Sequence, residues 1–306
     1  MLSIPIMSRS LLALVLFAFA LSGTPAFSLA RHTLQEEYPD MSFGVLRFAR
    51  LSELPKGVVL KSDGVAIHES VLLLMVEKES PELRDELKQN LLLLLEQEVT
   101  NKLLLAQAYQ EGYPKDLPED QTILSFKNSK IPAVSVSDED AKAFCEDNNA
   151  MLGNLPFEQV ADAVKTHLLE QKREEAFEAY LLDLAKSKNI QIQSSWAKEN
   201  CALARDNPVD QARSSGKPTI VEFGATGCTA CDLMQPILAK LKERFFGKIN
   251  VVFIHVRHYP ILASRYRITL IPVQAIFDKT GKEVFRHMGF LPQNEIEKRL
   301  AEIGVN

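Results

Sequence analysis

With 306 residues, the chain is long for one domain and sufficient for two. Its composition is that of an ordinary globular protein, with 46% hydrophobic and 25% charged residues and a net charge of −5. Residues 31–193 carry a net charge of −11, and residues 194–306 carry +5. Neither half contains a basic stripe interleaved with aromatic residues, which argues against a nucleic-acid-binding protein.

The first 30 residues match the pattern of an export signal. Arg9 precedes an apolar run over residues 11–21, and the small residues Ser28 and Ala30 follow it. This pattern predicts cleavage after Ala30, or alternatively after Ala26. The run is too short for a permanent anchor, since a bilayer span needs about 20 apolar residues. We expect an exported protein, located in the periplasm, with no membrane span after cleavage of the signal peptide.

The first half of the exported chain is expected to be mainly helical. Two short apolar runs, residues 58–60 and 65–67, flank a Gly-containing turn and predict a hairpin, and a helix follows to Val76. From Pro81 to Gly112, leucines recur at helical spacing and predict one long helix between a Ser-Pro start and a glycine stop. This Leu-rich helix serves either as core or as one wall of a client-binding groove.

Two more helices complete this half. Ser137 and the three acidic residues after it predict the capped start of a helix that runs to about Asn148. Residues 156–188 predict a long amphipathic helix, whose charged outer face at residues 170–178 is interpreted as solvated surface.

Four segments of this half resemble the N-terminal helical domain of SurA-type periplasmic chaperones. They are Val59-Leu-Lys-Ser-Asp-Gly-Val-Ala-Ile-His-Glu-Ser, the Leu-rich helix ending near Gly112, Val136-Ser-Asp-Glu-Asp, and Leu168-Leu-Glu-Gln-Lys-Arg. The resemblance implies a chaperone-like module that contacts unfolded polypeptides. A parvulin prolyl isomerase domain usually interrupts the helices in that family. Fewer than ten residues separate Asn148 from Phe157 here, so no such domain fits.

Residues 194–206 are expected to link the halves, and Asn207 and Pro208 predict the cap and first residue of a short helix. Strands and helices then alternate. Residues 219–223 predict a strand, residues 250–256 a second strand buried on both faces, and residues 273–277 and 283–287 a hairpin. Helices are expected from Cys228 to about Phe246, over residues 261–266, and from Gln293.

Cys228 and Cys231 lie at the start of the first of these helices. Unpaired backbone N–H groups at a helix N-terminus favour a thiolate over a thiol, and one helical turn brings the second sulfur close enough for a disulfide. The spacing therefore predicts a redox dithiol. A zinc half-site or a structural bridge is the alternative, but the sequence has no second Cys-x-x-Cys or His-x-x-His pair, so we expect no metal and no cofactor. Cys145 and Cys201 either bridge or remain thiols.

The segment Thr219-Ile-Val-Glu-Phe-Gly-Ala-Thr-Gly-Cys-Thr-Ala-Cys, followed by Ile-Pro before the hairpin, resembles the thioredoxin fold over residues 208–305. The resemblance implies that Pro272 is cis, adjoins the dithiol and lines a substrate groove. The expected substrate-binding residues are Ile271, Pro272, Gly227 and Thr229. Thioredoxins usually have Trp at the position of Gly227 and Gly-Pro between the cysteines, and both departures leave the redox direction open.

The expected catalytic residues are Cys228, Cys231 and Glu222. Cys228 is the predicted nucleophile, and Cys231 resolves the mixed disulfide. Glu222 either accepts the proton of Cys231, where thioredoxins typically have Asp, or faces solvent at a sheet margin. His255 and His258 are interpreted as core or surface histidines.

The predicted architecture is a two-domain α+β protein. A signal peptide (residues 1–30) precedes an all-α SurA N-like domain (31–193), a linker (194–206) and an α/β thioredoxin fold with a mixed sheet flanked by helices (207–306). The predicted function is a thiol–disulfide oxidoreductase acting on cysteine-containing proteins, with a redox partner protein and unfolded polypeptides as further partners. The alternative is a non-catalytic periplasmic chaperone or assembly factor that uses the thioredoxin fold for docking.

Overall fold

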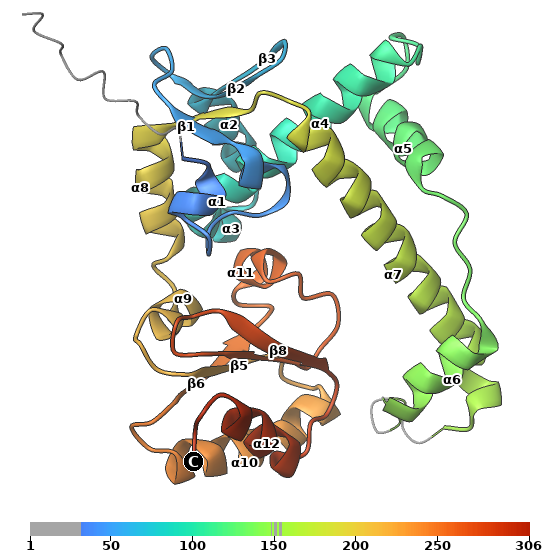
Figure 1. The fold of residues 1–306 in the computed structure, drawn as a ribbon, viewed down its shortest axis with the longest axis vertical. Coiled ribbons are helices and arrows are strands. Elements are labelled where there is room, and N and C mark those ends of the chain that lie inside the picture. The colour runs from blue at the N-terminus through green and yellow to red at the C-terminus, as the bar shows by residue number, and fades with distance from the viewer. Residues whose placement is uncertain (1–31, 148, 150–151, 153–154) are drawn as a thin grey trace, which may run out of the picture. The chain divides into compact units, whose positions relative to one another are not determined.

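The computed structural model describes residues 32–147, 149, 152 and 155–306 (Figure 1). The predicted signal peptide lies outside the described residues. Among the residues that are described, no helix is both long enough and apolar enough to cross a membrane.

The first half contains a small four-stranded sheet of order β1-β4-β2-β3. Its strands are β1 (Arg50–Ser52), β2 (Val58–Ser62), β3 (Val65–His68) and β4 (Gln191–Gln193). The predicted hairpin is confirmed, because β2 and β3 pair antiparallel around Gly64, whose φ is +74°. β1 and β4, which no sequence pattern predicted, pair in parallel across about 140 residues of chain. The half is mainly helical but is therefore not all-α.

Helices enclose a core on this sheet. The elements around it are α1 (Leu34–Glu37), the 3-10 turn η1 (Gly44–Phe48), α2 (Glu69–Lys78), α3 (Pro81–Gln89), α4 (Leu91–Gln110) and α8 (Ser194–Ala204). The central leucines Leu92 and Leu95 are 2% and 0% exposed. These leucines are core, as one of the two sequence interpretations expected.

The expectation of one helix from Pro81 to Gly112 is wrong, because the chain breaks at Asn90. Asn90 has φ −122° and ψ 36°, and its side-chain amide donates to the Glu86 carbonyl. This local hydrogen bond competes with the helical ladder. The predicted stop is confirmed, since Gly112 has φ +90°.

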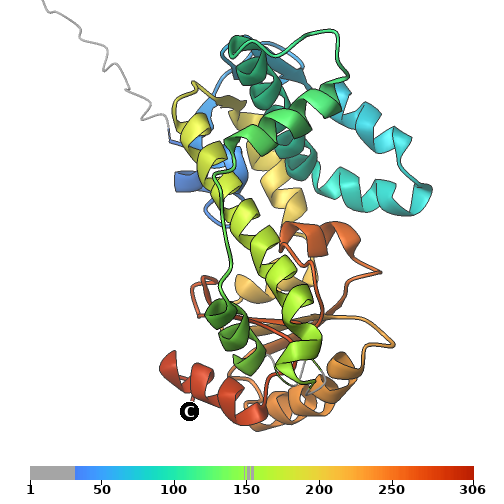
Figure 2. The same ribbon diagram turned by 90° about the vertical axis from the view of Figure 1, so that its right-hand side faces the viewer.

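A third group of helices forms two smaller cores. α5 (Glu119–Lys130), which the sequence did not predict, contributes Phe126 to a cluster with Phe177 of α7 (Phe157–Lys186). α6 (Asp138–Asp147) packs on the first turns of α7 (Figure 1 and Figure 2). The predicted cap is confirmed, because the Asp140 N–H donates to the Ser137 hydroxyl.

The segment expected as a linker is the helix α8. Its Trp196, Cys201 and Ala204 belong to the core on the first sheet. Cys145 and Cys201 are both free thiols, and burial raises the pKa of Cys201 to about 12. Cys201 is therefore a buried packing residue rather than a reactive thiol.

The second sheet has the order β6-β5-β7-β8, with β5 parallel to β6 and antiparallel to β7. Its strands are β5 (Thr219–Gly224), β6 (Asn250–His255), β7 (Val273–Phe277) and β8 (Glu283–Met288). β5 and β7 are buried along their whole length. β6 was expected to be buried on both faces, and this is wrong: it is an edge strand, and Phe253 is 40% exposed. Apolar composition does not distinguish a central strand from an edge strand.

Helices lie on both sides of this sheet (Figure 1). α10 (Thr229–Arg244) and α12 (Gln293–Glu302) pack on the face that carries Ile220 and Ile276. α9 (Pro208–Arg213) and α11 (Pro260–Arg265) contribute to the core on the face of Val221 and Phe223. The predicted cap of α9 is confirmed, because the Asn207 side chain accepts from two backbone N–H groups.

α11 also contacts the elements around the first sheet. The Leu262 N–H donates to Glu86 Oε1 at 2.8 Å, and the Arg265 guanidinium donates to the Ala204 carbonyl at 2.7 Å. Ile261 packs against the core on the first sheet. The two sheets are thus joined through α11.

Candidate active site

Cys228 is the N-cap residue of α10. Its Sγ accepts a hydrogen bond from the Cys231 N–H at 3.2 Å, and the two cysteines, with Cα atoms 5.2 Å apart, are joined in a disulfide. A backbone donor at Sγ and the N-terminus of a 16-residue helix both favour negative charge on this sulfur in the reduced protein.

The two sulfurs have different surroundings. Cys231 is 1% exposed, whereas Cys228 is half-buried and part of it is accessible to solvent. A Cβ added to Gly224 would lie 3.3 Å from Cys231 Sγ and 2.9 Å from the Phe253 ring. The last residue of β5 is therefore glycine because the buried sulfur packs directly on the strand.

Glu222 lies two residues before Gly224, so its side chain points to the same face of β5 as the Cys231 contact. It is fully buried, and neither carboxylate oxygen has a hydrogen-bond partner among the described residues. Burial raises the pKa of Glu222 from 4.5 to about 8. Glu222 does not face solvent, and its proton affinity lies near the physiological range.

The Ile271–Pro272 peptide bond is cis. β7 runs antiparallel to β5, and Val273 pairs with Phe223. Pro272, the residue before Val273, therefore lies level with Gly224, where the dithiol turn begins. Pro272 is buried and Ile271 is half-buried, while Gly227 and Thr229 are exposed. Gly227 has φ +79°, a conformation that favours glycine. The fold thus brings the four expected substrate-binding residues to the same end of the sheet as the dithiol.

His255 has a role that sequence reasoning missed. It ends β6 opposite Gly224, and its Nε2 accepts from the Thr226 N–H at 3.1 Å. Its ring stacks on His258 with centroids 4.0 Å apart. His255 therefore holds the turn before Cys228. A parallel alignment of the two predicted strands was the only signal in the sequence that could have indicated this.

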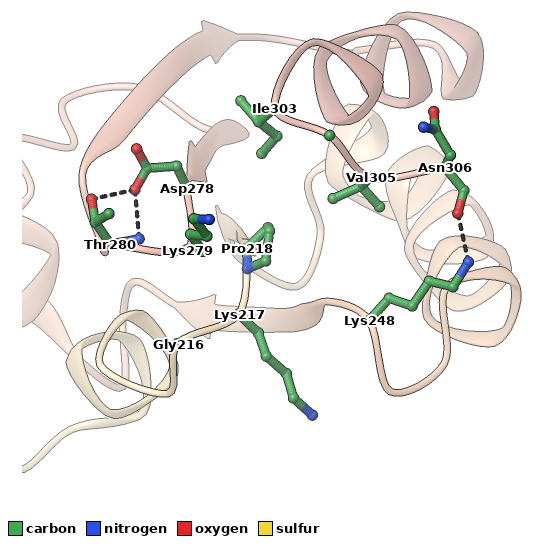
Figure 3. A pocket seen from close by; sticks show the side chains of 11 residues that line it. Gly216, Lys217, Pro218, Lys248, Asp278, Lys279, Thr280, Ile303, Val305 and Asn306 are labelled. Atoms are coloured by element: carbon green, nitrogen blue, oxygen red, sulfur yellow. Dashed lines mark hydrogen bonds between the residues drawn. The ribbon is translucent and has the colours of Figure 1, made fainter.

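A separate pocket lies at the opposite end of the sheet (Figure 3). It is lined by residues before β5 and β6, after β7 and at the C-terminus, among them Lys217, Lys248, Asp278 and Asn306. None of the expected site residues lines it. In the described part of the chain, no group of three or more His, Cys, Asp or Glu side chains is arranged to hold a metal ion.

Comparisons with known proteins agree with the fold. A family model described as a thioredoxin-like domain matches residues 206–304. Thioredoxin Y2 of Arabidopsis thaliana, a chloroplastic protein, is 41% identical over 91 residues, which are 30% of this chain and 54% of that protein. The chain thus spans about half the length of this relative.

Other relatives are covered more completely. A thiol:disulfide interchange protein TxlA homolog of Synechocystis is 31% identical over 41% of this chain and 71% of its own length. A thioredoxin of Alicyclobacillus acidocaldarius is 32% identical over 32% of this chain and 92% of its own. Among solved structures, a chloroplastic thioredoxin z is 33% identical over 31% of this chain and 85% of that chain, with a TM-score of 0.29.

Three observations indicate the same fold for residues 206–304. They are the family match, the sequence identity of the relatives, and the strand order with the cysteine pair at the start of α10. The predicted thioredoxin-like fold is confirmed there. Through this part, the chain belongs to the thioredoxin family.

Proposed function

We propose that the protein is an exported thiol–disulfide oxidoreductase that acts on protein cysteines through Cys228 and Cys231. One observation carries the proposal: the buried sulfur of Cys231 packs at Gly224 on the same face of β5 as the unpaired, buried carboxyl of Glu222, while Cys228 is accessible at a helix N-terminus. The relatives, which include a thiol:disulfide interchange protein homolog, support this class of activity.

The reaction has two exchange steps. The Cys228 thiolate attacks a substrate disulfide, a bond forms between Cys228 Sγ and one substrate sulfur, and the other substrate sulfur leaves as a thiolate. Cys231 then gives its proton to the Glu222 carboxylate and attacks Cys228 Sγ, which releases the second substrate thiolate. The substrate gains two electrons and the dithiol becomes a disulfide. In the reverse direction, the same steps oxidise a substrate dithiol.

Insulin reduction by the full chain tests the proposal. We expect Cys228→Ser to reduce the rate to that of the uncatalysed reaction. Cys231→Ser should still attack and should accumulate a mixed disulfide on Cys228, which is visible as a mass increase. Wild-type-like reduction by Cys228→Ser would overturn the nucleophile assignment.

Alkylation of the reduced protein near neutral pH provides an independent check. Cys228 should be labelled before Cys231, because only Cys228 is accessible. The reduction potential then assigns the direction, since thioredoxin has about −270 mV and the oxidant DsbA about −120 mV. Equal labelling of the two cysteines would contradict the assigned roles.

We further propose that the helical half is a SurA-type module that binds unfolded polypeptides. The supporting observation is a pair of exposed apolar side chains on α2, Leu73 and Leu74, which are 41% and 63% exposed. In the full chain, Leu73→Ser/Leu74→Ser should weaken the suppression of client aggregation and leave insulin reduction unchanged. If the suppression survives the double substitution, this surface does not bind clients.

The non-catalytic alternative makes the opposite prediction. A docking or assembly factor would keep its cellular function in a Cys228→Ser/Cys231→Ser variant. Export to the periplasm is tested by fractionation of cells that express the full chain or a chain without residues 1–30. Only the full chain should reach the periplasm, and an uncleaved cytosolic product would contradict the signal peptide.

A further inference from the structure

Gln274 is a second buried polar side chain without a partner on the sheet of the dithiol. It lies in the central strand β7 and is 0% exposed. Neither its amide nitrogen nor its amide oxygen has a hydrogen-bond partner among the described residues. A buried polar group without a hydrogen bond has lost its contacts with water and gained none in return, so an amide at this position requires an explanation.

Gln274 pairs with Glu222 in the antiparallel register of β7 and β5. Directly opposite residues point to the same face, with Cβ atoms about 4.5–5.5 Å apart. The next pair on this face, Ile220 and Ile276, is apolar and fully buried. The two unpaired polar groups of this face are therefore neighbours, on the side where Cys231 packs on Gly224.

We propose that Gln274 is a positioning residue for the proton transfer of the dithiol: its side-chain N–H donates to the ionised Glu222 carboxylate. A donor to the charged form favours that form. The amide thus increases the fraction of Glu222 that is ionised and able to take the proton of Cys231. This inference deepens the proposed function and rests on it for its catalytic consequence, but the effect on Glu222 is measurable by itself.

Few charged groups besides Glu222 itself lie on this face of the sheet, so few could change the pKa of Glu222. From α10 the facing titratable group is Cys231, and the other inward residues of α10 and α12 are apolar, namely Met234, Leu238, Leu241, Ile296 and Leu300. β6 contributes Phe253 opposite Glu222. The half-buried charged residues of α12 are Glu295, Glu297 and Arg299. Glu297 pairs with Arg244, and Arg299 pairs with Glu302.

His287 of β8 is the remaining titratable group on this row, beyond Gln274 in the register. Its Nε2 lies 3.2 Å from the Phe290 carbonyl oxygen. The amide of Gln274 stands between this imidazole and Glu222. Titration of His287 must therefore be followed separately from that of Glu222.

The first experiment measures the pKa of Glu222 directly and does not depend on activity. Carbon NMR of side-chain carboxyl groups is recorded against pH in the oxidised full chain, where Cys228 and Cys231 are joined in a disulfide and do not titrate, and His287 is followed in the same samples. Gln274→Met keeps the side-chain volume and removes the amide. It should raise the pKa of Glu222 by about one unit, and Gln274→Leu should act in the same way. An unchanged pKa in both variants overturns the inference.

The second experiment measures the consequence for exchange. A mixed disulfide is formed on Cys228, and its resolution by Cys231 is followed against pH. Gln274→Met should slow resolution about tenfold at pH 7 and shift the midpoint upward by the same one unit. In a Glu222→Gln background the same substitution should have no further effect, because Gln274 acts through Glu222.

A merely structural role predicts different results. Loss of packing would slow resolution equally with and without the Glu222 carboxyl, and the pH midpoint would not move. Gln274→Asn, which retains an amide, should restore part of the wild-type profile. If the wild type itself resolves no mixed disulfide, the proposed function fails, while the carboxyl titration still decides the role of Gln274.

Discussion

The two faces of the second sheet differ in whether their buried polar side chains have hydrogen-bond or ion-pair partners. On the face of α9 and α11, Asp210 is 3% exposed and every oxygen is engaged: Arg265 and Arg213 pair with it at 2.8 and 3.0 Å, and the Tyr266 hydroxyl donates at 2.7 Å. The same Arg265 donates to the carbonyl of Ala204, which ends α8 and belongs to the core on the first sheet. This network is satisfied and joins elements that are distant in the sequence.

On the face of α10 and α12, Glu222 and Gln274 are equally buried and unpaired. The pKa of Glu222 is accordingly raised to about 8, with burial as its cause. A fully paired buried charge, such as that of Asp210, stabilises the fold. An unpaired buried carboxyl on the face of the dithiol, such as that of Glu222, can change its protonation state and take part in proton transfer.

The largest change in stability should come from removing the buried ion pairs of Asp210. Asp210→Ala leaves Arg265 and Arg213 buried without their counter-charge, so the free energy of unfolding should fall by about 3–5 kcal/mol. Urea unfolding measures it. Asp232→Ala, an exposed acid in the first turn of α10, is the matched control and should change stability by less than about 0.5 kcal/mol. Equal losses in the two variants would contradict the assignment.

On the face of α10 and α12, removing the buried charge should raise the free energy of unfolding rather than lower it. The folded-state pKa of Glu222, about 8, exceeds its ordinary value of 4.5, so between these pH values the folded protein binds more protons than the unfolded chain. Stability should therefore fall as pH rises through this window, by about 1.4 kcal/mol per unit. Glu222→Gln removes this pH dependence. The stability of the variant relative to that of the wild type should therefore be greater at pH 7.5 than at pH 5.5, by about 2–3 kcal/mol.

Urea unfolding of the oxidised protein at several pH values checks this prediction. Glu243→Gln, at an exposed position of α10, should retain the wild-type slope. Parallel stability curves for wild type and Glu222→Gln would mean that Glu222 is ionised in the folded protein at neutral pH.

A smaller effect is expected where Cys231 contacts the strand. Gly224→Ala places a Cβ 3.3 Å from Cys231 Sγ and 2.9 Å from the Phe253 ring, and overpacking of this kind costs about 1–3 kcal/mol. Adding Phe253→Leu should recover part of the loss, because it removes the closest contact. A Gly224→Ala protein with wild-type stability would show that the sulfur does not constrain this position.

The smallest effect should come from the turn. His255→Ala removes the acceptor of the Thr226 N–H, which should cost about 0.5–1.5 kcal/mol and change the alkylation rate of Cys228. His258→Ala, which loses only the ring stack, is the control and should leave that rate unchanged. An identical response of the two variants would mean that the hydrogen bond does not position the turn.

Local signals in the sequence predicted much of the second half. The cap at Asn207, the helix that begins after Cys228 and the hairpin before the last helix each depend on residues within a few positions of one another, and all three are confirmed. In the first half, leucine spacing predicted helix but not the break at Asn90, because a side chain that bonds the backbone carbonyl one turn earlier interrupts the helix without altering the periodicity.

By itself, the sequence determined that two cysteines stand one turn apart at a helix start after an apolar strand. Only the tertiary structure decided that β6 is an edge strand, that α8 belongs to the first core, and that Gln274 lies opposite Glu222. Strand order and register arise from contacts between segments far apart in the chain. Because they also decide which polar groups lose water and find no partner, the proton affinity of Glu222 is a property of the folded molecule.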